Sequence, residues 1–119
     1  MRTLSGTPER LVEKADELLR DMPGSYIVPN VLMRRAAARE QMGDLTAAID
    51  GLDLVLAQHA HRSGFAAEAA QRRCLLLGRI PARAETARAA CEAFLRDYSY
   101  VARYQSEVQT LLDTLGRTK

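Results

Sequence analysis

Apolar residues recur at helical spacing along most of the chain, and short polar or Gly/Pro-containing segments divide this pattern into six stretches. In the first stretch, Leu11, Ala15 and Leu18 lie on one face, which is typical of an amphipathic helix. Six such helices joined by short links predict an all-α fold of about three antiparallel helix pairs. The inward stripes of three later helices are expected to contain Ala48, Ile49, Leu52, Val55 and Leu56; Ala87, Ala90, Cys91, Phe94 and Leu95; and Val101, Tyr104, Val108, Leu111, Leu112 and Leu115.

Residues that start and stop helices predict the boundaries of the first three. Thr7 is expected to cap the first helix, with Pro8 in its first turn. Ser25 is expected to cap the second helix, which ends at Gly43, and Asp44 is expected to cap the third.

The same reasoning divides the second half of the chain. The fourth helix opens at Ser63 or Gly64 and ends with Gly78 as its C-terminal cap. The fifth is expected over about residues 82–97, and Ser99 is expected to cap a sixth that ends at Gly116. A single domain over residues 1–119, with an ordered core over about 7–116, accommodates all six.

The helix pairs repeat along the chain. Leu19, Leu56 and Leu95 take equivalent places and are separated by 37 and 39 residues, which is one helix pair with its linkers. Segments 19–21 and 95–97 share the sequence Leu-Arg-Asp, and each is followed by a turn and a Ser-Tyr pair. The repeat predicts a stack of similar units that share one core.

Segment 42–49, Met-Gly-Asp-Leu-Thr-Ala-Ala-Ile, resembles the core of the tetratricopeptide repeat. The resemblance covers roughly residues 8–115 and implies that Gly43 ends one helix, Asp44 caps the next, and Ala48 allows the two to approach closely. Upstream residues depart from the family in part, since Arg35 and Arg39 stand where it prefers Leu and Tyr. The same resemblance gives structural roles to Gly78 and Ala87 in the following unit, and it places Leu32 and Ala36 where the family has Trp and a small residue.

The long linkers are similar to those of bacterial periplasmic scaffold repeats of the outer-membrane assembly lipoprotein and cell-division coordinator families. The resemblance implies a TPR-like α-α superhelix whose first helices line a concave groove that binds a peptide segment or helix of a partner protein. On the chain, the groove is expected to be lined by Asn30, Met33, Arg34, Ala37 and Glu40 and, in the next unit, by Phe65, Glu68, Ala69, Arg72 and Leu75. Met33 and Phe65 are candidate apolar anchors; packing between repeats is the alternative role for both.

Composition and charge limit the other functions. The chain is 47% hydrophobic and 27% charged, which favours a globular domain over a disordered one. Its net charge of +2 is too balanced to indicate a nucleic-acid partner, and Glu40, Glu68 and Glu85 are spaced to pair with neighbouring arginines. An Arg-rich binding face would need Arg34, Arg35, Arg39, Arg72, Arg73, Arg79 and Arg83.

An enzyme is not expected. His59 and His61 lie two residues apart without further metal ligands at suitable spacing, so surface histidines are favoured over a zinc site. The sequence contains no phosphate-binding Gly-rich loop and no nucleophile elbow. We therefore expect no catalytic residues, no metal and no cofactor.

Cys74 and Cys91 fall on inward stripes of neighbouring helices. Buried thiols that pack as small apolar groups are the favoured interpretation, and a disulfide would require an oxidising compartment. Residues 1–6 lack the apolar core of a signal peptide, and no segment is long and apolar enough to span a membrane. The expected location is cytoplasmic, with the periplasm as the alternative if a signal sequence has been removed.

Self-association is a further possibility. A stack of three pairs exposes faces at its ends, and Tyr98, Tyr100 and Tyr104 lie near the start of the last helix. These tyrosines can cover one end of the stack or dock a second copy as a homodimer. A further alternative is that the chain is one domain of a larger bacterial regulatory or envelope protein.

Overall fold

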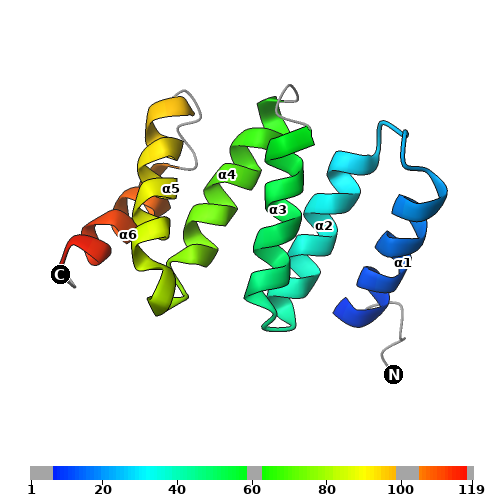
Figure 1. Ribbon diagram of the computed structural model, residues 1–119, viewed down its shortest axis with the longest axis horizontal. Coiled ribbons are helices and arrows are strands. Elements are labelled where there is room, and N and C mark those ends of the chain that lie inside the picture. The colour runs from blue at the N-terminus through cyan, green and yellow to red at the C-terminus, as the bar shows by residue number, and fades with distance from the viewer. Residues whose placement is uncertain (1–6, 59–62, 99–104, 118–119) are drawn as a thin grey trace. The chain divides into compact units, whose positions relative to one another are not determined.

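The computed structural model describes residues 7–58, 63–98 and 105–117. These residues form six α-helices and no strand, which confirms the all-α fold predicted from the apolar pattern. The helices are α1 (Pro8–Asp21), α2 (Val28–Gln41), α3 (Leu45–Gln58), α4 (Ser63–Leu77), α5 (Ala84–Asp97) and α6 (Gln105–Arg117), with a 3₁₀ turn, η2 (Pro81–Arg83), before α5 (Figure 1).

The chain divides into two compact units: unit 1, Met1–Ala60, and unit 2, His61–Lys119. In unit 1, α2 packs against both α1 and α3, and the three helices run in alternating directions (Figure 1). In unit 2, α5 packs against both α4 and α6, and α4 also contacts α6. Whether the two units stack as one repeat domain over residues 1–119 stays a prediction.

The helix ends of unit 1 follow from its capping residues. Thr7 Oγ1 accepts a hydrogen bond from the Arg10 amide at 3.2 Å, as expected for an N-cap. Gly43 has a φ of +81°, a conformation that costs glycine little. Asp44 Oδ1 then accepts from the Ala47 amide at 3.3 Å and caps α3. The predicted Gly43-Asp44 boundary is confirmed.

The start of α2 differs from the predicted one. Ser25 Oγ accepts from the Ile27 amide at 3.2 Å, so this hydroxyl stabilises the turn that precedes the helix. The N-cap of α2 is Ile27, which provides no side-chain hydrogen bond, and Pro29 lies in the first turn. Ser25 was therefore placed too early as a cap, because the turn and the cap use the same kind of local hydrogen bond.

Small residues lie where α2 and α3 meet. Ala48 is completely buried, and Ala36 is nearly so. A Cβ built on Gly51 would lie 3.7 Å from the Ala36 Cβ, which is ordinary van der Waals contact. The two helices therefore pack closely through side chains of one carbon or fewer. Leu32, the residue at the family's Trp place, is also buried beside this interface.

Unit 2 has its own apolar core. One cluster of buried residues in this core consists of Cys74, Cys91, Phe94 and Val108, contributed by α4, α5 and α6. Phe94 also stacks on Tyr98, with ring centroids 5.8 Å apart. Ala87, the predicted small residue of this unit, is completely buried on α5.

Gly78 has a role that the sequence pattern did not predict. It follows the last residue of α4, but its φ is not positive, so it does not act as a left-handed cap. A Cβ at this position would lie 2.6 Å from Leu111 Cδ2. A side chain at this position would therefore displace the Leu111 side chain of α6, which glycine leaves in place. Gly116 lies inside α6 and does not end it, whereas α5 covers the expected range apart from its first two residues, which belong to η2.

Candidate partner-binding groove

Two adjoining hollows lie between α1 and α2 on one side of unit 1. Their volumes are about 130 and 270 Å³, and Leu11 and Arg34 line both. We call them together the α1–α2 groove. Its lining consists of Leu11, Lys14, Ala15 and Leu18 from α1 and Val31, Arg34, Ala37, Ala38 and Gln41 from α2.

The groove has an apolar floor and two cationic side chains. Ala15, Val31 and Ala38 are buried beneath it, whereas Leu11 and Leu18 are only half-buried. Lys14 lies 3.4 Å from Glu17, but both side chains are largely exposed, so this pair is weak. Arg34 is exposed and forms no ion pair with the described residues. The arrangement can hold an apolar segment that carries acceptors or negative charge.

The structure brings only some of the predicted α2 residues to this groove. Arg34 and Ala37 line it. Asn30 is exposed elsewhere on the same helix, and Glu40 is half-buried and has an interaction partner. Met33 is 9% exposed and therefore offers a partner little surface.

The other predicted groove residues belong to α4 in unit 2. Phe65, Glu68 and Arg72 are half-buried, and Arg72 has an interaction partner. Leu75 packs on the core of unit 2, and Ala69 is completely buried. A continuous groove that combines the α2 and α4 residues stays a prediction.

Sequence reasoning missed the contribution of α1. Leu11 and Leu18 were assigned to its inward stripe, but α2 covers them only in part. The sequence contained a usable signal, because Leu11, Val12, Leu18 and Leu19 together form a stripe wider than one neighbouring helix can bury.

The two arginines that depart from the repeat pattern are accommodated by polar partners. Arg35 Nη1 donates to Asp16 Oδ1 at 2.7 Å and thereby joins α2 to α1. Arg39 Nη1 donates to the Ala47 carbonyl at 3.4 Å, between α2 and α3. Each guanidinium therefore donates one hydrogen bond to a neighbouring helix of unit 1 through Nη1. Within the described residues, Glu68 and Glu85 form no ion pair, whereas Glu40 has an interaction partner.

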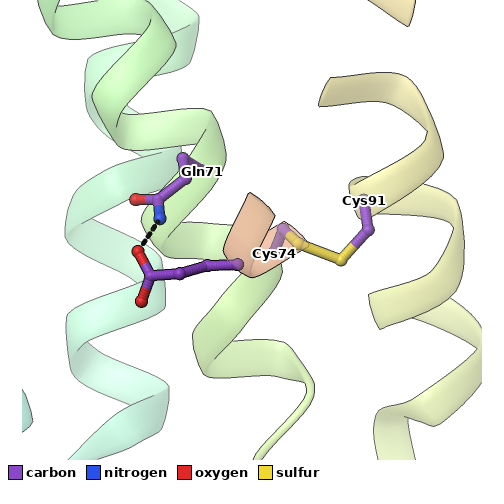
Figure 2. Close-up of a disulfide and its surroundings, with 4 residues drawn as sticks. Gln71, Cys74 and Cys91 are labelled. Carbon is purple, nitrogen blue, oxygen red and sulfur yellow. Dashed lines mark hydrogen bonds between the residues drawn. A yellow bond between two sulfur atoms is a disulfide. The ribbon is translucent and has the colours of Figure 1, made fainter. Parts of the chain in front are cut away.

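The favoured interpretation of the cysteines is wrong. Cys74 and Cys91 form a disulfide that joins α4 to α5, with their Cα atoms 4.9 Å apart, and neither is exposed (Figure 2). Burial on facing stripes, which suggested two packed thiols, also brings the sulfur atoms within bonding distance. Beside the disulfide, buried Gln71 Nε2 donates to Glu107 Oε1 at 3.1 Å and joins α4 to α6.

The remaining predictions concern the histidines, the tyrosines near the last helix, metal ligands and membrane spans. His59, His61, Tyr100 and Tyr104 fall outside the described ranges. Tyr98 is half-buried and stacked on Phe94. No cluster of three or more metal-ligating side chains occurs in the described part of the chain. The described helices also include none with the length and apolarity of a membrane span.

Comparisons with known proteins do not assign the chain to a family. No family model, curated protein or solved structure matches the chain. The tetratricopeptide resemblance thus depends on the residues of segment 42–49 and on the 37- and 39-residue spacings, and it stays a prediction beside the observed all-α fold.

Proposed function

We propose that this chain is a TPR-like protein-interaction module that binds a segment of a partner protein in the α1–α2 groove. The observation that carries the proposal is the pair of adjoining hollows, which have an apolar floor and are lined by the cationic side chains of Lys14 and Arg34. Helices that are already folded lose little conformational entropy on binding, so such a surface favours recognition.

The dimensions of the groove favour a short segment. From Val31 to Gln41, α2 rises about 15 Å at about 1.5 Å per residue. That length accommodates about ten residues of a helix or about four of an extended strand. A helix whose apolar stripe lies along Leu11 and Leu18 would complete a three-helix contact with α1 and α2. Lys14 and Arg34 would favour acidic residues along its edges.

Selection from a phage library of random peptides on the immobilised full chain tests the proposal. Selected peptides are expected to bind with a tenfold or greater loss on Arg34→Glu, a change of about 1.4 kcal/mol or more. Arg20→Glu is the matched control, since Arg20 is exposed on α1 outside both hollows and the substitution changes the net charge equally.

A second variant tests the apolar floor without adding charge. Leu11→Asn removes a half-buried side chain that lines both hollows, and it is expected to weaken the same peptides. Circular dichroism establishes that each variant remains folded. Peptides that bind all three variants equally well would place the binding surface elsewhere. Light scattering distinguishes peptide binding from pairing of two copies through this groove.

We further propose that the chain folds in an oxidising compartment, the periplasm of a bacterium being the expected one. The completely buried disulfide between Cys74 and Cys91 supports this, since such bonds form and persist where thiols are not kept reduced. Of the two locations expected from the sequence, the proposal therefore favours the periplasm over the cytoplasm.

Thiol trapping tests the compartment. The chain is produced in a bacterial host with and without an export signal, quenched in acid, denatured, and treated with a maleimide polymer that retards free thiols on a gel. The exported chain is expected to show no modification and the cytosolic chain two modified thiols. Complete oxidation in the reducing cytosol would remove the argument for export.

A further inference from the structure

A third hollow of unit 1 lies on a different side of α2 from the α1–α2 groove. Its volume is about 230 Å³, and α1, the α1–α2 turn, α2 and α3 all contribute to it. Leu54 is 39% exposed here, one of few large apolar side chains so open in the described residues. We call this hollow the Arg35 pocket; it is lined by Leu19, Pro23, Val28, Leu32, Arg35, Leu54 and Gln58.

Arg35 is unusual among the lining residues because most of its hydrogen-bonding capacity is unused. Its side chain is 13% exposed, and Nη1 alone donates, to Asp16. Nε is buried and has no hydrogen-bond partner among the described residues. Leaving a buried donor unpaired is costly, and such a group calls for an explanation.

The unused donors have a defined geometry. In a guanidinium, Nε–H and one Nη2–H lie parallel on the same edge, whereas Nη1 lies beside Cδ on the other side. Asp16 engages Nη1 and leaves the Nε/Nη2 edge without a described acceptor. That edge matches the two oxygens of a carboxylate, which it binds through two parallel hydrogen bonds.

We propose that the Arg35 pocket binds a partner segment in which a large apolar side chain adjoins an Asp or Glu. The apolar side chain fills the space between Leu19 and Leu54, and the carboxylate takes the Nε/Nη2 edge of Arg35. Because Nε is buried, the carboxylate reaches this edge only when the side chains that cover it move aside. Charge complementarity favours the acid over an amide.

The size of the pocket favours a protein side chain over a free metabolite. Small-molecule sites usually measure about 300–1,000 Å³, which exceeds the 230 Å³ of this hollow. The site is separate from the α1–α2 groove, because the two have no lining residue in common. A partner can therefore engage either one alone, and the two are tested independently.

Nuclear magnetic resonance of the ¹⁵N-labelled full chain tests the site, with acetyl-Leu-Asp-amide as the probe and acetyl-Leu-Asn-amide as its neutral isostere. The Arg35 Nε–Hε signal and the amides of Leu54 and Gln58 are expected to shift saturably with the acid. The isostere is expected to bind at least tenfold more weakly. Arg35→Lys keeps the charge but removes the fork of two parallel donors, so it is expected to reduce the preference for the acid, and Arg35→Met, which removes the charge as well, is expected to abolish it.

Arg34→Lys is the matched control, since Arg34 is the preceding residue on α2 and does not line this pocket; its variant is expected to retain the preference. Equal binding of acid and isostere, or the absence of saturable shifts at Leu54 and Gln58, would overturn the proposal. A response confined to Leu11 and Lys14 would also overturn it, while supporting the α1–α2 groove as the binding surface.

Discussion

Unit 1 and unit 2 each contribute three of the described helices, yet these helices are held together differently. In unit 1, α2 contacts both neighbours, whereas α1 and α3 have no substantial contact with each other. In unit 2, all three pairs of helices are in contact, and a disulfide joins α4 to α5. The α1–α2 groove and the Arg35 pocket both lie in unit 1.

The difference has a physical reason. Three helices in mutual contact cover one another's apolar stripes, so Cys74, Phe94 and Val108 form one buried cluster. Within unit 1, α1 packs against α2 alone, and Leu11 and Leu18 are accordingly only half-buried. Incomplete coverage costs stability but provides surface for a partner. We therefore expect unit 2 to resist perturbation and unit 1 to bind.

Overpacking the α2–α3 interface is expected to have the largest effect. Ala48 is completely buried, so Ala48→Trp forces α2 and α3 apart and is expected to cost more than about 3 kcal/mol, enough to unfold unit 1. Thermal unfolding by circular dichroism measures the loss. Ala57→Trp, at an exposed position of the same helix, is the control and is expected to leave the melting temperature nearly unchanged.

The same variant shows whether unit 2 stays folded when unit 1 is disrupted. If the units are independently stable, the amide signals of α4 and α5 survive in Ala48→Trp while those of α2 and α3 disappear. Loss of every native signal would show that unit 2 depends on unit 1. A native melting temperature for Ala48→Trp would contradict the close packing itself.

Removing the disulfide is expected to act on unit 2. The bond joins residues separated by 17 positions, and closing a loop of this length stabilises a fold by about 3 kcal/mol in the chain-entropy model. The Cys74→Ala, Cys91→Ala double variant is therefore expected to lose about 3 kcal/mol of unfolding free energy in urea. Hydrogen exchange is expected to accelerate in α4 and α5 and to remain unchanged in α1.

A reduction experiment provides the control for that variant. The wild-type chain, denatured and refolded with reductant, keeps both sulfur atoms but lacks the bond, so its loss of stability isolates the cross-link from the missing side-chain volume. An equal stability of oxidised and reduced chains would mean that unit 2 is held by packing alone. Faster exchange in α1 would contradict the separation of the two units.

Much of the fold was predictable from local signals. The Thr7 cap and the Gly43-Asp44 boundary depend on hydrogen bonds and a backbone conformation within a few residues, and both were identified. Helical periodicity also identified the buried positions Ala48 and Ala87. These features are encoded by short stretches, so one sequence suffices to find them.

Features that depend on distant residues were not predictable in the same way. Gly78 follows a helix, which suggested a cap, but its close neighbour is Leu111 on another helix. The hollows described in unit 1 lie between α1 and α2, so their position depends on how two helices pair and not on one local stretch. The groove expected from α2 and α4 residues stays a prediction. In each case the sequence indicated a special position, and the spatial neighbour that determines its role was missing.

A smaller effect is expected at Gly78. In Gly78→Ala, the new Cβ meets the end of the Leu111 side chain, which can rotate at a cost of about 1–2 kcal/mol. Urea unfolding measures the loss. A second substitution, Leu111→Ala, removes the clash, so the effect of Gly78→Ala should vanish in that background. Gly24→Ala, where a Cβ has open space, is the control.

Unit 1 contains one ion pair between its helices among the described residues, and its removal is expected to have the smallest effect. Asp16 is 47% exposed and Arg35 13% exposed, so water screens the pair only from the Asp16 side. Asp16→Asn keeps the shape of the side chain and removes its charge, and it is expected to cost about 0.5–1 kcal/mol of unfolding free energy. The loss is expected to shrink in high salt.

Glu17→Gln is the matched control for Asp16→Asn, since its 3.4 Å pair with Lys14 is exposed on both sides and its removal is expected to change stability very little. A double-mutant cycle with Arg35→Met separates the pair from the other effects of each substitution. A coupling of several kcal/mol would mean that Asp16 neutralises a buried charge, as in an interior ion pair. Arg35 would then have no charge to spare for a partner's carboxylate. A coupling below about 1 kcal/mol leaves the Arg35 guanidinium able to bind a second carboxylate. Unit 1 would then offer a partner a cationic group as well as incompletely covered apolar surface.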